Sequence, residues 1–99
     1  MTRLLLAAAV LSIPAASLQA GAISRACIQS DRPATPALCS CIQRAADLTL
    51  GSRDQNRAAS FFRDPHKAQE VRVSDSRQDN AFWNRYQNFG QTAKAMCGN

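Results

Sequence analysis

The sequence predicts an all-α domain, a small bundle of four or five short helices held by two disulfides. Apolar residues recur at helical spacing, and cap and proline signals divide the chain into short segments. Four cysteines occur in a chain of 99 residues, which is too short to bury a large core. Small exported domains commonly gain the missing stability from disulfides.

The first residues have the parts of a secretory signal peptide. A basic residue, Arg3, precedes an apolar run, and small residues follow up to Ala20 and Ala22. The apolar run has about ten residues, whereas a membrane-spanning helix needs about 20. We therefore predict a signal peptide over residues 1–20, cleaved after Ala20 or Ala22. The remaining single domain, residues 21–99, would be periplasmic or secreted, without a transmembrane segment and with a net charge of +4.

Two helices are expected in the first half of this domain. A short helix over residues 23–30 would end before the next proline, because the residue preceding a proline is pushed out of helical geometry. Thr35 followed by Pro36 is a cap-then-proline signal for a second helix over residues 36–50. Gly51 would close that helix in the left-handed conformation.

One face of the second helix is apolar when successive residues are placed about 100° apart. The centre of this face is formed by Leu38, Ile42, Ala45 and Thr49. Cys39 and Cys41 lie on opposite flanks, so each is expected to bond a different neighbouring helix. The second helix would then lie in the middle of the molecule.

Two further short helices are expected before the last one. Ser52 and Gln55 have the spacing of a capping box, which predicts a third helix over residues 53–63. The Asp-Pro pair at residues 64–65 repeats the cap-then-proline signal and opens a fourth helix over residues 65–72. Helices this short are marginal in isolation, so their stability must come from packing.

The last helix is the best-defined element of the sequence. After a polar start at residues 74–76, apolar residues recur at steps of four, three, four and four. These residues are Phe82, Tyr86, Phe89, Ala93 and Cys97. Because Cys97 lies on this stripe, its sulfur is expected to point into the core. We interpret Gly90 as a packing notch or as a break near the helix end.

The four cysteines, Cys27, Cys39, Cys41 and Cys97, are expected to form two disulfides. Cys39 and Cys41 point about 200° apart on a helix and do not readily bond each other. Two pairings remain, since Cys27 can bond either of them and Cys97 the other. We prefer Cys27 with Cys39 and Cys41 with Cys97, because Cys27 and Cys39 lie near the loop that joins their helices.

Other chemistry at these residues has weaker support. A Cys-x-Cys pair near a helix start could be a redox pair, and four cysteines could bind zinc. However, an oxidising compartment disfavours free thiolates, and zinc sites usually show two closely spaced cysteine pairs. His66 has carboxylates nearby but is explained as a surface residue in the first turn of a helix. We predict no catalytic residue, no cofactor and no metal site.

Arginines alternate with aromatic residues in two segments, residues 61–63 and 82–86. This combination is favoured at protein interfaces and in cation–π contacts. The candidate interaction surface consists of Arg63, His66, Trp83 and Arg85. The alternative is that the aromatic rings belong to the core and the arginines only to the solvated surface.

Three segments carry a resemblance to a known family. Residues 38–43 read LCSCIQ, residues 61–69 read FFRDPHKAQ and residues 82–86 read FWNRY. The mature chain resembles a group of short exported proteins of Gram-negative bacteria that has no established function. Some members carry the name "arginine transporter", so the resemblance implies a link to arginine uptake by name only. The residues do not support transport, because no spanning segment remains after signal cleavage and no carboxylate cluster marks an arginine pocket.

The leading functional hypothesis is a small, exported, non-enzymatic accessory or interaction protein whose basic surface binds an acidic partner protein. One alternative is a binder of anionic envelope components such as lipid headgroups. Another is a thiol–disulfide redox protein that uses Cys39 and Cys41. Nucleic acid is not an expected partner, since export separates the protein from it.

Overall fold

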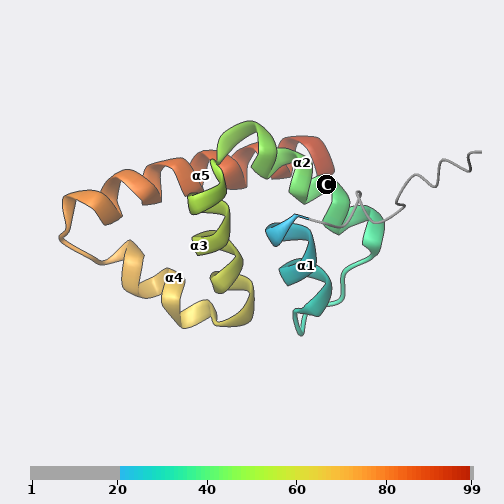
Figure 1. Ribbon diagram of the computed structural model, residues 1–99, viewed down its shortest axis with the longest axis horizontal. Helices are drawn as coiled ribbons and strands as arrows, with labels where there is room; N and C mark the ends of the chain where they lie inside the picture. The colour runs from blue at the N-terminus through green and yellow to red at the C-terminus, as the bar shows by residue number, and fades with distance from the viewer. Residues whose placement is uncertain (1–20, 99) are drawn as a thin grey trace, which may run out of the picture.

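The computed structural model describes residues 21–98 and confirms an all-α domain with two disulfides. No strand occurs in these residues, and the helices are α1 (Ala22–Gln29), α2 (Pro36–Thr49), α3 (Ser52–Arg63), α4 (Pro65–Arg72) and α5 (Arg77–Cys97). In Figure 1, α5 runs along one long side of the domain, where it contacts α2, α3 and α4. The short helix α1 packs against α2 and α3. The expected signal peptide lies outside the described residues.

Two helix starts follow the predicted signals. Thr35 Oγ1 accepts a hydrogen bond from the backbone N–H of Leu38 at 3.0 Å, and Asp64 Oδ1 accepts one from that of His66 at 3.1 Å. A proline stands in the first turn of both helices, α2 and α4. Side-chain caps satisfy N–H groups that have no partner within the helix, so these residues determine where α2 and α4 begin.

The start of α3 differs from the prediction. Its N-cap is Gly51, which is extended with φ −71° and ψ 172°, so Gly51 is not a left-handed cap of α2. The capping box is wrong as well, because Ser52 is the first helical residue and no side chain caps α3. Gln55 Nε2 instead donates to the carbonyl oxygen of Leu50 at 3.1 Å. The chain therefore passes from α2 to α3 through two extended residues, Leu50 and Gly51. The side chain of Leu50 is buried.

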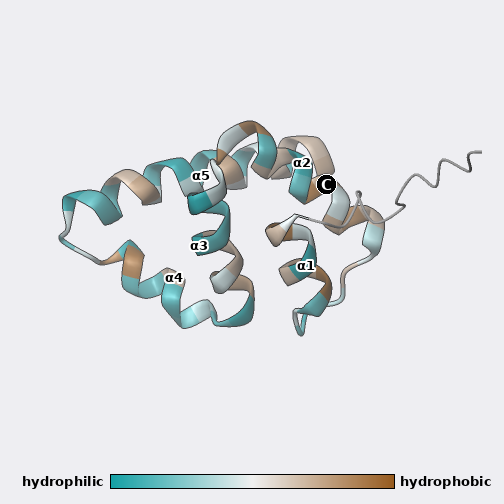
Figure 2. Ribbon diagram, in the orientation of Figure 1, coloured by the Kyte–Doolittle hydropathy of each residue, from teal (hydrophilic) through white to brown (hydrophobic). Residues whose placement is uncertain are grey.

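The core contains aromatic rings from α3 and α5 and small residues from the first three helices. The ring centroid of Phe61 lies 5.9 Å from that of Phe82 and 5.1 Å from that of Tyr86, both in edge-to-face geometry. Buried alanines of α1, α2 and α3 allow these helices to approach one another closely. The hydrophilic colour predominates on α4, in which Val71 is the one buried residue (Figure 2).

The last turns of α5 are less buried than the sequence predicts. The helix continues through Gly90, which is exposed and where a Cβ would meet nothing within 4 Å. Gly90 is therefore neither a packing notch nor a break. The buried residues of α5 are Phe82 and Phe89, whereas Cys97 is half-buried. The sulfur of Cys97 bonds α2 at the edge of the domain instead of entering the core.

Candidate functional site

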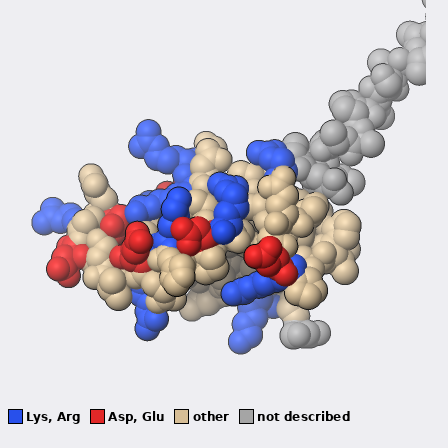
Figure 3. All heavy atoms as spheres, turned by 90° about the horizontal axis from the view of Figure 1, so that it is seen from below, with Lys and Arg blue, Asp and Glu red and all other residues tan. Residues whose placement is uncertain are grey.

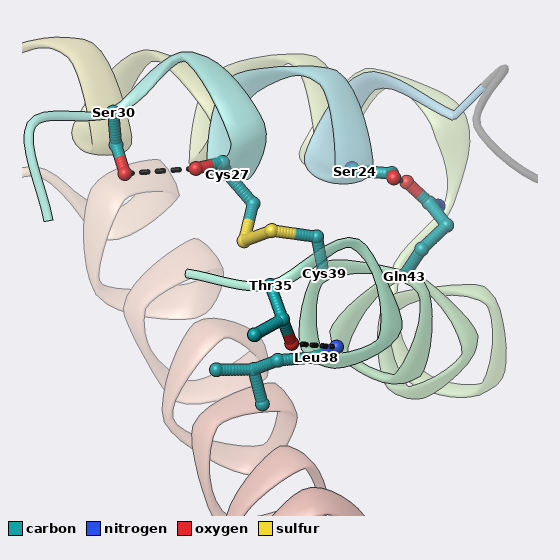
Figure 4. The surroundings of a disulfide bond; sticks show 7 residues. All are labelled: Ser24, Cys27, Ser30, Thr35, Leu38, Cys39 and Gln43. Atoms are coloured by element: carbon teal, nitrogen blue, oxygen red, sulfur yellow. Dashed lines mark hydrogen bonds between the residues drawn. A yellow bond between two sulfur atoms is a disulfide. The ribbon is translucent and has the colours of Figure 1, made fainter. Parts of the chain in front are cut away.

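Both disulfides have the preferred pairing. Cys27–Cys39 joins α1 to α2 (Figure 4), and Cys41–Cys97 joins α2 to α5, with Cα–Cα distances of 5.6 and 5.8 Å. Residues 21–98 contain no free cysteine, so Cys39 and Cys41 do not supply the thiols that a redox protein would need. Two disulfides are consistent with an oxidising extracytoplasmic compartment.

The described part of the chain has neither a cluster of potential metal ligands nor a helix suited to cross a membrane. Between residues 21 and 98, no group of three or more His, Cys, Asp and Glu side chains could hold a metal ion. Among the helices of this region, none has the length and apolarity that a membrane crossing requires.

The buried face of α2 is shifted from the predicted one toward the side of Cys39 and Ala46, although Ala45 of the predicted centre is buried. Cys39 and Gln43 are buried and point toward α1, whereas Leu38 points away from α1 in Figure 4 and is 36% exposed. The disulfide to Cys27 explains this difference, because it turns the Cys39 side of α2 toward α1. Leu38 and Ile42, which were expected at the centre of the buried face, line an open cavity, and the half-buried Ile42 also packs against the core.

A polar cluster around Gln43 joins α1, α2 and α3. Gln43 Oε1 accepts a hydrogen bond from the backbone N–H of Ser24 at 2.8 Å. Gln43 Nε2 donates to Asp47 Oδ1 at 2.9 Å and to Gln55 Oε1 at 2.8 Å. Because the N-cap of α1, Gly21, has no side chain, Gln43 caps α1 from the neighbouring helix. Sequence reasoning missed this role, although Gln43 lies one turn after Cys39 and therefore faces the same way.

A cavity of about 400 Å³ lies between the α1–α2 loop, one side of α2 and the corner where α3 meets α4. Small-molecule sites in proteins usually enclose about 300–1,000 Å³. Most of the wall is apolar, and its main members are Leu38, Ile42, Phe61, Phe62, Pro65 and Ala68. The cavity is therefore large enough, and apolar enough, to hold a small ligand.

Arg32 and Tyr86 are two of the polar residues that line this cavity, together with Ser30 and Gln69. Arg32 is the only charged residue in the lining, and it is exposed and forms no ion pair within residues 21–98. Burial raises the pKa of the Tyr86 phenol above its ordinary value, and the positive charge of Arg32 opposes this shift. The phenol therefore stays protonated at neutral pH.

Two members of the candidate interaction surface, Trp83 and Arg85, lie on α5 and point in different directions. They are two residues apart, as the cysteines of the Cys-x-Cys pair are, and therefore project about 200° apart around the helix axis. The half-buried Trp83 packs on Tyr86, with ring centroids 5.2 Å apart. Arg85 donates from Nε to Asp54 Oδ2 at 2.6 Å and from Nη2 to Oδ1 at 3.1 Å. The carboxylate of Asp54 raises the pKa of Arg85, whose guanidinium is occupied within the domain.

The other two members, Arg63 and His66, lie exposed at the corner of α3 and α4. The four residues of the candidate surface thus come from three helices, with Arg63 on α3, His66 on α4, and Trp83 and Arg85 on α5. On the face shown in Figure 3, basic side chains project from several places with acidic side chains between them. The candidate surface stays a prediction, and its charge is more dispersed than the net charge suggests.

No protein-family model, curated protein or solved structure matches this chain. The resemblance to short exported proteins stays a prediction, and function has to be argued from the chain itself. The cavity is the site with the clearest chemistry. Its apolar wall, one guanidinium and one phenol can hold and orient a small molecule.

Proposed function

We propose that this chain is a small, exported, non-enzymatic binding protein whose cavity holds a small apolar ligand. The observation that carries this proposal is the placement of Leu38 and Ile42, two apolar side chains that line the cavity and stay partly exposed there. Apolar surface in contact with water costs about 25 cal/mol per Å², and a ligand that covers the wall recovers this free energy. Periplasmic or secreted localisation follows from the predicted signal peptide, and the two disulfides suit it.

This proposal keeps the non-enzymatic, exported role of the leading hypothesis but moves recognition into the cavity. The hypothesis of an acidic partner protein depends on a continuous basic surface. Arg85 is bonded to Asp54, and Arg63 and His66 lie at a different place in the domain. Binding of an acidic partner therefore remains a separate prediction, which the cavity neither requires nor prevents.

Binding of a neutral apolar fluorophore tests the proposal. Phenylnaphthylamine, which brightens in apolar surroundings, is titrated into the protein, and we expect saturable binding. Ala34→Phe places a ring into the cavity from the α1–α2 loop and should weaken binding at least about tenfold. The matched control is Ala37→Phe, because Ala37 is exposed on α2 and does not line the cavity.

Two outcomes would overturn the proposed function. One is the absence of saturable binding to the unmodified domain. The other is equal binding by Ala34→Phe and Ala37→Phe while circular dichroism shows that both are folded. If Ala34→Phe fails to fold, Ala68→Phe replaces it. Ala68 lines the same cavity from α4, so a phenylalanine there would also fill it.

A further inference from the structure

The lining of the cavity carries one positive charge and no negative one. Arg32 lies in the loop between α1 and α2, next to the apolar wall. Neither of the two ion pairs found within residues 21–98 involves Arg32, so its guanidinium is available to a ligand. A cation beside an apolar wall favours a molecule that combines an apolar body with a negative charge.

Tyr86 supplies a second donor at the same place. Its ring is fixed by contacts with Phe61 and Trp83, at centroid distances of 5.1 and 5.2 Å. No hydrogen bond within residues 21–98 uses its hydroxyl group, which is protonated at neutral pH. Arg32 and Tyr86 both line the cavity, so a ligand that occupies it can approach both groups.

The number of cations in the lining selects among anions. One guanidinium matches one carboxylate, which it can bind through two parallel hydrogen bonds. A phosphate monoester carries nearly two negative charges at neutral pH and would leave part of its charge uncompensated here. Free arginine does not fit, since its side chain would bring a second cation beside Arg32 and would find no carboxylate in the lining.

We propose that the cavity binds an apolar monocarboxylic acid, with its hydrocarbon body against Leu38, Ile42 and Phe62 and its carboxylate bonded to Arg32 and Tyr86. This inference rests on the proposed function, because it assigns the ligand class of the same cavity. It also gives a chemical reason for the position of Arg32, which no residue of the described chain neutralises.

Displacement of phenylnaphthylamine by three ten-carbon compounds tests the ligand class. Decanoate, decanol and decyltrimethylammonium have the same chain but a negative, a neutral and a positive head. We expect decanoate to bind about five- to tenfold more tightly than decanol, and decyltrimethylammonium to bind most weakly. The fluorescence of Trp83, the only tryptophan, gives an independent signal because its ring packs on Tyr86.

Two variants connect this preference to Arg32. Arg32→Gln should bind decanol as the unmodified protein does but lose the preference for decanoate. Arg53→Gln has the same net charge and removes an exposed arginine at the opposite end of α3 from the cavity, so it should keep the preference. Tyr86→Phe should reduce the ratio of decanoate to decanol affinity by about half or more, since one of the two proposed hydrogen-bond donors is lost.

Each result has a distinct meaning. Loss of the decanoate preference in Arg32→Gln but not in Arg53→Gln supports the inference. Equal binding of decanoate and decanol by the unmodified protein overturns the inference, although the proposed function stands. If neither phenylnaphthylamine nor any ten-carbon compound binds, the proposed function is wrong and the inference falls with it. Competition by free arginine at similar concentrations would also contradict the inference.

Discussion

Among single residues, Gln43 connects the most elements, because its side-chain amide bonds α1, α2 and α3. Leucine has a similar size but no polar atoms, so Gln43→Leu would leave the backbone N–H of Ser24 without an acceptor. A buried donor without a partner costs about 1–3 kcal/mol. In a urea titration we expect the free energy of unfolding to fall by about 2 kcal/mol.

The matched control for this variant is Gln87→Leu on the exposed side of α5. Substitutions at exposed positions usually change the free energy of unfolding by no more than about 0.5 kcal/mol. Equal losses in the two variants would show that capping by Gln43 does not stabilise α1.

Substitution of Gly90 is expected to stabilise the domain, because this glycine occupies an exposed position within α5 where a Cβ has free space. Glycine costs about 0.5–1 kcal/mol relative to alanine inside a helix. Gly90→Ala should therefore raise the free energy of unfolding by about this amount. Gly21→Ala is the contrast, since its Cβ would displace the Gln43 amide and should destabilise the domain. Thermal melts of both variants would contradict this view if their midpoints moved in the same direction.

Individual residues differ in how far the sequence predicts their role. Thr35 and Asp64 were identified as caps because a cap bonds an N–H two or three residues away, within reach of a local pattern. The bonds of Gln43 reach Ser24 and Gln55, which are 19 and 12 residues away. No local pattern contains such partners, so only the packing of α1 and α3 on α2 reveals them.

At the scale of elements, one ion pair fixes α3 against the start of α5. Arg57 Nη2 lies 2.5 Å from Asp79 Oδ1, and the Arg57 guanidinium lies 4.6 Å above the Phe82 ring. The hydrogen bond from Arg57 lowers the pKa of Asp79 below its ordinary value. A carboxyl whose pKa is lower in the folded state stabilises the fold above its unfolded pKa of about 3.9 and loses this effect as the pH falls further.

Acid should therefore weaken the contact between α3 and α5. We expect the urea midpoint of the unmodified protein to fall when the pH is lowered from about 6 to about 3. Asp79→Asn should show a smaller fall over the same interval, because the group that titrates is missing. Asp75→Asn, at an exposed residue just before α5, serves as the control and should behave as the unmodified protein. An identical fall in all three proteins would contradict this assignment.

The two disulfides differ in their exposure to solvent. Cys27 and Cys39 are 3% and 0% exposed, whereas Cys41 and Cys97 are half-buried. Exchange requires a thiolate to approach a sulfur atom, so exposure controls its rate. Limiting dithiothreitol at neutral pH should reduce Cys41–Cys97 first, which alkylation and peptide mapping would detect. Prior or simultaneous reduction of Cys27–Cys39 would show that burial does not protect it.

Helical periodicity predicted where each helix occurs better than it predicted which side of the helix is buried. In α2 the predicted apolar stripe is present, but the disulfide to α1 and the hydrogen bond that Gln43 accepts from Ser24 shift the buried side toward Cys39 and Gln43. A stripe shows which residues are apolar, and neighbouring helices decide which of them are covered. The pairing of Cys39 was predicted from loop proximity, whereas its effect on Leu38 and Ile42 was not.

The cavity belongs to the whole molecule. Its wall combines the α1–α2 loop, α2, the corner of α3 and α4, and Tyr86 of α5, which are separated by up to about half of the chain. Sequence reasoning offered two roles for the arginines and aromatic residues, a shared interaction surface or aromatic rings in the core with solvated arginines, and neither role includes a cavity. Arg32 and Tyr86 line the same cavity only after the chain folds, so this arrangement has no signature in either segment.

Reduction of both disulfides tests how far the helices can hold the domain without them. The bonds join residues 12 and 56 positions apart, and in the chain-entropy model such loops contribute about 3 and 4 kcal/mol. Their sum is comparable to the total stability of a small domain, about 5–15 kcal/mol. The fully reduced and alkylated protein should therefore lose its cooperative thermal transition and most of its helical circular dichroism. A reduced protein that melts cooperatively near the temperature of the oxidised one would contradict this view and would assign the stability to helix packing.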